Sequence, residues 1–483
     1  MKKSVSILAL ALACTLAAQA KLHLNPLVGD NMVLQQRTDA RLWGTATPGA
    51  TVTATPSWGE ATSVKADKDG RWLLKVATPA ASFTPHSITF TDSEGDRIEV
   101  AGVLSGEVWL ASGQSNMEMP LRGFGGCCVQ DGIDEAINAK TVEGVRMFKV
   151  PLGMSYEPLD EIEGHWSTTE NYRDVLDFSA TAWFFANSLS RALDAPGGIV
   201  NCAFGGTKVE SWTPRDILET YPDVSLDPKD IEEIVPYHRP MLMYNAMFTP
   251  VQLYSYKGII WYQGCSNVGF HDTYPQRLAN MVERWRKEIG LGEIPFYYVE
   301  IAPYDYGDEQ PADKKPGAPE AGALLREAQF KAQSIIPNSG MVCTNDLVEP
   351  FELHNIHPRR KAPVGQRLSY LALNRTYGHK DVCDSGPVYA GWTPKGREAW
   401  VRFDNLAMGI CRNYMLEGFE IAGPDRVFHP ATGWLHWQTN EIVLTADGVD
   451  EPVAVRYGFG NFRPGTLIGG NEQPAVPFRT DDW

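Results

Sequence analysis

The sequence predicts an α/β protein in which a parallel sheet carries helices on both faces and is flanked by a β domain on each side along the chain. Three observations predict this class. Short β-rich runs separated by turn residues occupy residues 21–102, apolar strands alternate with helices of period 3.6 over residues 103–380, and β-rich runs return over residues 381–483. Alternating strands and helices are typical of a parallel sheet that is covered on both faces.

Residues 1–20 have the pattern of a signal peptide. A lysine pair precedes an apolar stretch at 5–18, and Ala18-Gln19-Ala20 has the A-x-A form of a signal-peptidase site. The stretch is too short to cross a bilayer, and no later segment approaches the roughly 20 apolar residues that a spanning helix needs. We therefore expect a periplasmic or secreted protein that begins at Lys21 and has no transmembrane segment.

The segment 21–102 predicts an N-terminal β-sandwich-like domain. Its strands are runs rich in β-branched and aromatic residues at 40–43, 51–54, 71–76 and 87–90. Between the second and third runs, Asp67-Lys68-Asp69-Gly70 has the composition of a hairpin turn. These features favour antiparallel pairing.

The segment 103–380 predicts the catalytic domain. The helix expected at 179–193 places five apolar side chains on one face, and Asp272 is positioned to cap a second helix whose apolar face runs from Leu278 to Ile289. The other expected elements are strands at 198–204, 257–262, 296–302 and 340–344 and helices at 321–333 and 363–373.

The segment 381–483 predicts a C-terminal β domain. Helical periodicity stops after Gly378. The β-rich runs that follow are separated by Gly, Pro and Asn, and they lie at 399–403, 419–421, 441–444 and 453–457.

The composition excludes nucleic acid as a partner. The chain has 59 acidic and 43 basic residues and a formal charge of −16 at pH 7, and the signal peptide would remove two of the lysines. This negative field repels phosphate backbones, and no basic cluster offsets it. The eight cysteines have no CxxC spacing, and Cys127 and Cys128 fit equally well as two loop thiols, as one bridged residue or as a vicinal disulfide.

Four loops that follow expected strands carry unusual residues, and such loops line the active sites of open parallel sheets. They contain Gly113-Gln114-Ser115-Asn116, Phe204 to Thr207 with Glu210 and Trp212 just beyond, Trp261 to Asn267, and His354 to Pro358. In the first loop a glycine permits a sharp turn, and Ser115 opens a helix whose free amides and dipole can stabilise a developing oxyanion. In the last loop His357 is suited to act as a general base near neutral pH. A serine after a strand and a histidine far downstream predict an esterase.

Each motif also has a purely structural explanation. Asn267 can cap a strand end, Gln114 and Gln263 either line the pocket or satisfy backbone groups, and Trp212 either stacks on a sugar ring or belongs to the core. The placement of these loops after successive strands favours the functional interpretation. No G-x-S-x-G sequence occurs, which argues against the α/β-hydrolase nucleophile elbow.

A metal site and a cofactor are not expected. His354 and His357 are three residues apart, but no glutamate follows as in H-E-x-x-H, and the next residue is Pro358. The predicted chemistry needs only side chains and backbone amides.

The motifs GQSNM, GGTKVESW, IIWYQGCSN and NIHPRRKAPVGQRL occur in this order, and together they resemble the SGNH hydrolases and, within them, the sialate O-acetylesterase family of carbohydrate esterases. The resemblance extends over nearly the whole mature chain, including residues 31–35, 285–286 and 326–329. It implies an SGNH-type, flavodoxin-like sheet.

The resemblance also implies site residues. Ser115 would be the nucleophile and His357 the general base. The oxyanion hole would consist of the Ser115 amide, a glycine amide of the Gly205-Gly206 pair, with Gly206 preferred, and the Asn267 side chain. The substrate-binding candidates are Gln114, Gln263 and Trp212.

The sequence departs from the family pattern at two positions. The superfamily usually has an acid three residues before the histidine, where this chain has His354, and relatives commonly have Glu where it has Cys265. The orienting partner of His357 is therefore open. Asp346, Glu349, Glu352 and a backbone carbonyl are the candidates, because loss of the triad acid weakens this chemistry without abolishing it.

We predict an exported, cofactor-free serine esterase that removes O-acetyl groups from carbohydrate, with O-acetylated sialic acid as the first choice of substrate. One alternative is the same chemistry on acetyl xylan or another plant polysaccharide. Another is a non-catalytic carbohydrate-binding protein with a degenerate site, which the missing acid at position 354 would explain.

Overall fold

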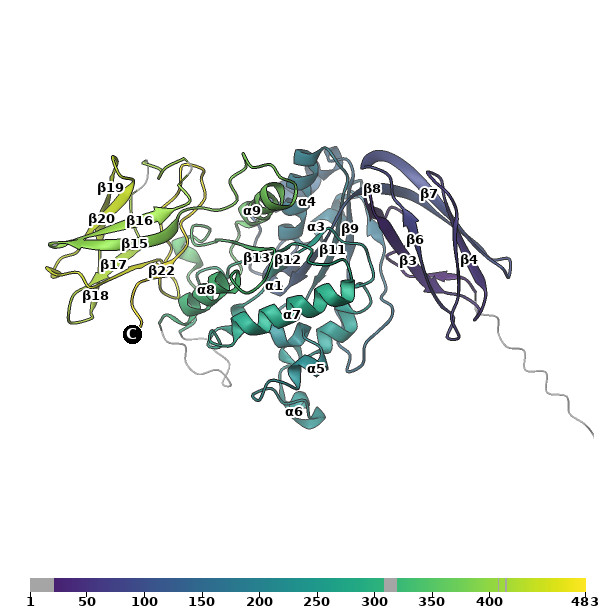
Figure 1. Cartoon of the computed structure of the whole chain (residues 1–483), viewed down its shortest axis with the longest axis horizontal. Coiled ribbons are helices and arrows are strands. Elements are labelled where there is room, and N and C mark those ends of the chain that lie inside the picture. Colours follow the sequence, from purple (N-terminus) through teal and green to yellow (C-terminus); the bar gives the residue numbers. More distant parts are fainter. Residues whose placement is uncertain (1–20, 308–318, 407, 413–414) are drawn as a thin grey trace, which may run out of the picture.

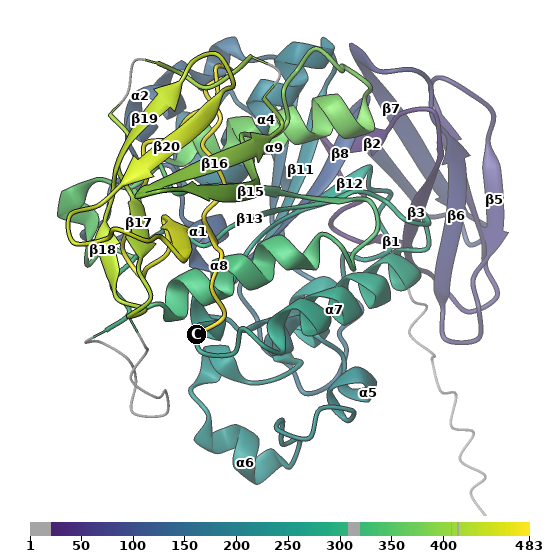
Figure 2. The same cartoon turned by 60° about the vertical axis from the view of Figure 1, so that its left-hand side comes forward.

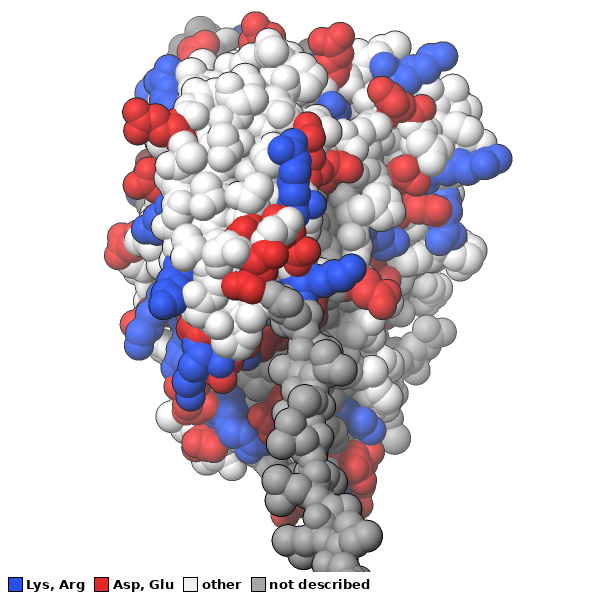
Figure 3. Space-filling model, turned by 90° about the vertical axis from the view of Figure 1, so that its right-hand side faces the viewer, with Lys and Arg blue, Asp and Glu red and all other residues white. Residues whose placement is uncertain are grey.

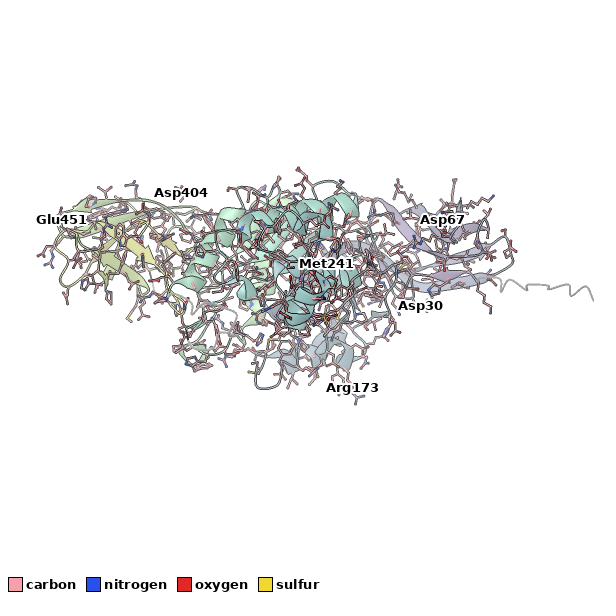
Figure 4. All side chains as sticks on the ribbon, turned by 90° about the horizontal axis from the view of Figure 1, so that it is seen from below. Asp30, Asp67, Arg173, Met241, Asp404 and Glu451 are labelled. Carbon is pink, nitrogen blue, oxygen red and sulfur yellow. The ribbon has the colours of Figure 1, made fainter. Side chains whose placement is uncertain are left out.

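The computed structural model describes residues 21–307, 319–406, 408–412 and 415–483, and the predicted signal peptide at 1–20 lies outside them. A β-rich N-terminal region, a central α/β region and a β-rich C-terminal region follow one another along the molecule (Figure 1). Figure 4 shows the same order from below, with Asp67, Met241 and Glu451 labelled in the three regions. The predicted α/β class with additional β sheets is confirmed.

The N-terminal region consists of two sheets around an apolar interior. The first contains β1 (His23–Leu24), β3 (Asp39–Thr45) and β6 (Arg71–Ala77), and the second contains β2 (Val33–Gln35), β4 (Thr51–Pro56), β5 (Thr62–Lys65), β7 (Ser82–Asp92) and part of β8 (Arg97–Gly113). Side chains of β6 alternate between exposed and buried, as the two-residue period of a strand requires, and Trp72, Leu74 and Val76 are buried.

The turn at 67–70 forms, but it does not close the hairpin that the sequence predicts. The Gly70 amide donates to the Asp67 carbonyl at 3.1 Å. However, β5 pairs with β4 whereas β6 pairs with β3, and these pairs belong to different sheets. The turn therefore connects the two sheets, because each flanking strand has its partner elsewhere.

Strand β8 joins the N-terminal and central regions. Its first half pairs antiparallel with β7, and its second half pairs parallel with β11 (Gly197–Ala203) and β12 (Gly258–Tyr262). The boundary predicted between residues 102 and 103 falls within this strand. The ranges 21–102, 103–380 and 381–483 therefore stay a prediction about domains.

The central sheet has the order β10-β9-β11-β8-β12-β13-β14. Numbered in chain order, β8, β11, β12, β13 (Phe296–Val299) and β14 (Ser339–Val342) take the order 2-1-3-4-5 of flavodoxin-like sheets. The short strands β9 (Val145–Lys149) and β10 (Trp166–Ser167) extend the sheet beyond β11, and the sequence did not predict them. Because β10 runs antiparallel to β9, the sheet is mixed, which corrects the expectation of a purely parallel one.

Helices cover both faces of the central sheet. Figure 2 shows α4 (Ala180–Leu193) and α9 (Lys361–Leu371) above the sheet and α7 (Tyr274–Ile289) and α8 (Ala321–Ala332) below it. Ser179 caps α4 by accepting a hydrogen bond from the Ala182 amide. The cap predicted for α7 is wrong, because the helix begins one residue later than expected, with Thr273 at the N-cap position.

Other short helices lie in the connections between these elements. They are α1 (Ser115–Glu118), α2 (Gly132–Asn138), α3 (Tyr172–Leu176), α5 (Arg215–Leu218) and α6 (Pro228–Glu233). No helix in the described part of the chain is both long enough and apolar enough to cross a membrane.

The C-terminal region has two four-stranded sheets with their own apolar core. In spatial order, the first sheet contains β15 (Val388–Lys395), β16 (Glu398–Asp404), β20 (Glu441–Thr445) and β19 (Thr432–His436). The second contains β18 (Phe428–Pro430), β17 (Phe419–Ala422), β21 (Ala454–Tyr457) and β22 (Phe478–Arg479). Buried Arg326 of α8 donates to the carbonyls of Gly458 and Gly460, which follow β21. These bonds attach the C-terminal region to the central one.

Acidic and basic side chains are intermingled on the end of the molecule formed by the N-terminal region (Figure 3). The acidic excess of the chain therefore does not gather into a patch of one sign on this face.

Candidate active site

Ser115 lies at the carboxyl end of the central strand, where the sequence predicted it. Gly113 ends β8 with φ +137°, and a β-carbon at this position would lie 2.2 Å from the carbonyl oxygen of Tyr262. Only glycine fits such a turn. Half-buried Ser115 is the first residue of the one-turn helix α1. The first amides of a helix have no acceptor within the helix, so they are free to bind a negative charge.

The Gly205-Gly206 turn follows β11 and lies against the serine. A β-carbon at Gly205 would come within 3.4 Å of the Ser115 β-carbon. The Gly205 amide is occupied, because it donates to Glu118 Oε2 at 2.5 Å. Gly206 has φ +77°, and its amide has no acceptor among the residues that the structure describes. The geometry therefore favours Gly206 over Gly205 as a free donor.

Asn267 is fixed at the end of the loop that follows β12, and 1% of its surface is exposed. Its Oδ1 accepts from Gln263 Nε2 at 2.7 Å and from the Val209 amide at 3.1 Å. Its Nδ2 donates one hydrogen to Glu210 Oε2 at 3.0 Å, and Glu210 in turn pairs with buried Arg277 at 2.6 Å. The carboxamide is thereby oriented, and one N–H of Nδ2 is left as a donor.

Gln114 and Gln263 connect the loops of the site to one another. Buried Gln114 accepts from the Gly264 amide at 2.8 Å through Oε1. Gln263 is fully buried, donates to the Thr207 carbonyl and to Asn267, and accepts from the Tyr274 hydroxyl at 3.0 Å. These bonds favour a supporting role over the direct substrate contact that we predicted.

Trp212 is part of the core beneath the site. It is fully buried, its Nε1 donates to Thr207 Oγ1 at 2.9 Å, and its ring packs edge-on against Trp261 and Trp285. A sugar ring has no access to it in this arrangement, so the structure favours the structural interpretation of this residue.

The histidine loop reaches the serine helix. Asn116 Nδ2 donates to the Ile356 carbonyl at 3.0 Å, which joins the residue after Ser115 to the residue before His357. Burial lowers the pKa of His357 to about 4, and the Lys361 cation adds to this shift. Within the described residues, buried Nε2 has no hydrogen-bond partner. The low pKa favours a neutral imidazole near neutral pH. The bond of a catalytic base to its nucleophile often tightens only when substrate binds.

No carboxylate orients His357 in the described part of the chain. Its Nδ1 lies 4.0 Å from Cys127 Sγ, and this thiol donates to Asn355 Oδ1 at 3.3 Å. The same Oδ1 accepts from the His357 amide at 3.0 Å. The Phe124 ring packs edge-on against the imidazole. A thiol and a carboxamide thus lie next to His357, where a triad acid was expected.

The acids that were candidates for this role are bound elsewhere. Asp346 pairs with both terminal nitrogens of Arg367, and Glu352 accepts from the amides of Glu349 and Arg359. The Glu349 side chain accepts from the Glu352 amide. His354 is exposed and lies 3.7 Å from Asp305.

The structure does not build a metal site from these residues. Among the described residues, no three His, Cys, Asp or Glu side chains form a cluster that could hold an ion. All seven cysteines after residue 20 are free thiols, so Cys127 and Cys128 are not bridged.

Sequence reasoning missed three residues at this site. Asn116 lies within the serine motif and Glu118 directly follows it. Lys361 opens α9 with 1% of its surface exposed. A signal for Lys361 existed, since it shares the buried helix face of Val364 and Leu368 at a spacing of three and seven residues. A charged residue at a core-facing position is a functional candidate.

Known proteins are similar to this chain in sequence and fold. The family model described as carbohydrate esterase, sialic acid-specific acetylesterase, matches residues 105–374. The sialate O-acetylesterase of Mus musculus is 29% identical over 420 residues, and the match covers 75% of this chain and 74% of the relative. That of Homo sapiens is 28% identical over 389 residues, and the match covers 75% of this chain and 72% of the relative. A solved carbohydrate acetylesterase from Xanthomonas citri is 32% identical with a TM-score of 0.82, covering 95% of this chain and 100% of its own.

Proposed function

The chain belongs to the sialic acid-specific acetylesterase family of carbohydrate esterases, and from this premise we propose that it is a serine esterase that removes O-acetyl groups from sialic acids. It is a carboxylic ester hydrolase, which sets aside the non-catalytic alternative. The names of its mammalian relatives support O-acetylated sialic acid as the substrate. The signal-peptide pattern of residues 1–20 supports action outside the cytoplasm.

In the first half of the proposed reaction, Ser115 Oγ attacks the acetyl carbonyl carbon while His357 Nε2 accepts the hydroxyl proton. The carbonyl oxygen becomes an oxyanion that accepts hydrogen bonds from the amides of Ser115 and Gly206 and from Asn267 Nδ2. The bond between the acetyl carbon and the sugar oxygen then breaks, and His357 returns its proton to that oxygen. The products are a free sugar hydroxyl and acetyl-Ser115.

In the second half, water attacks the acetyl-serine ester and His357 accepts one of its protons. The same oxyanion donors serve this intermediate. Acetate leaves as the proton returns to Ser115 Oγ, so the enzyme is regenerated without a cofactor. A neutral imidazole is required at both attacks, and the low pKa of His357 supports this state at neutral pH.

The observation that carries the proposal is that three strand-end loops bond or pack against one another at the edge of the sheet where Ser115 lies. The loops after β8, β11 and β12 supply, respectively, the serine, the free Gly206 amide and the oriented Asn267 donor. A serine nucleophile needs such fixed donors beside it, because they stabilise charge that appears only during the reaction.

Acetate release from O-acetylated sialoglycans tests the proposal, with Ser115→Ala as the inactive variant. Ser334→Ala is the matched control, because this serine is exposed at the end of α8 and its hydroxyl bonds only the Lys331 carbonyl. We expect release by the wild type and the control and none above background by Ser115→Ala. Equal release by Ser115→Ala would contradict the proposed nucleophile.

Acetylated plant polysaccharide is the second candidate substrate. The solved relative that covers 95% of the chain is described as a carbohydrate acetylesterase without mention of sialic acid, and its identity exceeds that of the mammalian relatives. Acetyl xylan therefore belongs in the same assay. Release from xylan alone would keep the mechanism and replace the substrate.

A further inference from the structure

Lys361 is a buried amine beside the proposed nucleophile. It is 1% exposed, its Nζ hydrogen-bonds Asn116 Oδ1, and it lies 5.7 Å from the centre of the Tyr262 ring. In the described part of the chain no carboxylate lies within ion-pair distance of it. Burying an ammonium group without an opposite charge costs free energy. A residue kept in this position therefore calls for a functional reason.

Asn116 connects this amine to the histidine loop. It is fully buried, and while its Oδ1 accepts from Lys361, its Nδ2 donates to the Ile356 carbonyl at 3.0 Å. This is the only hydrogen bond that the described residues make between α1 and residues 353–360. Two consecutive bonds thus run from Lys361 to the residue that precedes His357.

The donor on Lys361 determines which way the Asn116 carboxamide faces. A carboxamide has one accepting and one donating end, and a donor at Oδ1 leaves Nδ2 for the Ile356 carbonyl. Without Lys361, the flipped carboxamide would place two acceptor oxygens against each other. A neutral amine still donates, so this bond does not require that Lys361 be charged.

We propose that Lys361 and Asn116 act as a pair of positioning residues that hold the His357 loop at the distance from Ser115 that proton transfer requires. The proposal rests on the proposed function, since it assigns His357 as the base. The proposed role involves no contact of Lys361 or Asn116 with substrate. Misplacement of a base by about 1 Å can reduce the rate about 100-fold, so a pair that sets this distance acts on kcat.

Burial lowers the pKa of Lys361 to about 7. The titratable groups that raise this pKa are Cys265, Glu352 and Cys127, and His357 and Tyr262 also lie near Lys361. Because the proposed role survives deprotonation, the test uses rate constants at one pH.

The test compares Lys361→Met, Asn116→Asp and the double variant in kcat, KM and the rate of Ser115 labelling by a fluorophosphonate. Asn116→Asp keeps the shape and a partner for Lys361 but places an acceptor against the Ile356 carbonyl. Lys257→Met is the matched control, because this lysine also lies over a tyrosine ring, 5.5 Å from the centre of Tyr377. Lys257 directly precedes β12, whereas Tyr262 ends that strand, so the control lies at the far end of the strand from the site.

We expect each single variant to lower kcat and the labelling rate about 10- to 100-fold, with KM changed less than about threefold. The double variant should be no slower than the slower single variant, because residues that act as one unit are not additive. The control should match the wild type.

Three results would overturn the proposal: single variants within about twofold of the wild type, a rise in KM with kcat unchanged, or losses that multiply in the double variant. If Lys361→Met does not fold, the nearly isosteric Asn116→Asp decides the question alone. A wild type without esterase activity would instead contradict the proposed function on which this inference rests.

Discussion

The serine side and the histidine side of the site are held in different ways. On the serine side, Gln114, Gln263 and Asn267 bond the strand-end loops directly to one another. On the histidine side, residues 353–360 make one hydrogen bond to α1, and among the described residues the imidazole has a thiol beside Nδ1 instead of a carboxylate. The difference indicates that this fold fixes the proposed oxyanion donors through more hydrogen bonds than it uses to join the proposed base to α1.

This division agrees with what each group does in the reaction. Oxyanion donors lower the barrier only when they are oriented before the charge develops, so networks that fix them are worth several kcal/mol. A base must move a proton between several oxygens, and its contribution persists in part when its orienting acid is missing. The comparison predicts the largest losses where the reacting groups are removed and smaller ones where the orientation of the base is disturbed.

Removal of the base should have the largest effect. His357→Ala is expected to reduce kcat about 1,000- to 10,000-fold, because it removes the proposed acceptor of the serine proton. Steady-state kinetics with 4-nitrophenyl acetate measure the loss. The control is His354→Ala, three residues earlier and exposed. An equal loss in this control would mean that the base has been assigned to the wrong histidine.

Removal of the oriented donor should have the next largest effect. Asn267→Ala is expected to reduce kcat about 100- to 1,000-fold with little change in KM, because the bond to the oxyanion exists only in the transition state. Asn280→Ala is a suitable control, since this asparagine on α7 bonds the Tyr221 hydroxyl away from the site. Unchanged kcat in Asn267→Ala would remove this residue from the oxyanion hole.

The pH profile should reveal the environment of the base. His357 must be neutral to act, and since burial lowers its pKa to about 4, activity should persist on the acid side until about pH 4. An unshifted histidine would already have lost roughly 30-fold at pH 5. The measurement is kcat/KM between pH 3.5 and 8. A decline centred near pH 6.5 would show that the imidazole is solvated during catalysis.

The thiol beside the base should matter least. Cys127→Ala removes the group next to Nδ1, and we expect kcat to fall about two- to tenfold, since a thiol is a weak hydrogen-bonding group. Cys128→Ala is the adjacent control, because Cys128 is exposed. A loss of about 1,000-fold in Cys127→Ala would show that the base is held as tightly as the oxyanion donors, contrary to the comparison above.

The sequence predicted the fold class and the convergence of the strand-end loops because both follow from rules that act locally. Parallel strands end at one edge of a sheet, so the loops that carry Ser115, Gly206 and Asn267 were expected at one edge. Hydrogen bonds join these loops to one another. A glycine before Ser115 indicated the sharp turn, and the structure shows why no other residue fits there.

Features that depend on distant partners were not predictable in the same way. Whether Gln263 faces substrate or core depends on Thr207 and Tyr274, which its own motif does not specify. For Trp212 it depends on Trp261 and Trp285, which lie far along the chain. The thiol beside His357 comes from a loop some 230 residues earlier in the chain. No spacing rule connects residues so far apart, so these contacts emerged only from the folded arrangement.

Covalent labelling tests the central assignment most directly. The mature protein would be treated with a fluorophosphonate, digested and analysed by mass spectrometry, with Ser115→Ala treated in parallel. The account predicts one adduct, on the peptide that contains Ser115, together with loss of acetate release in proportion to labelling. An adduct on another serine that accompanies the loss of activity, or full activity in a protein labelled at Ser115, would contradict it.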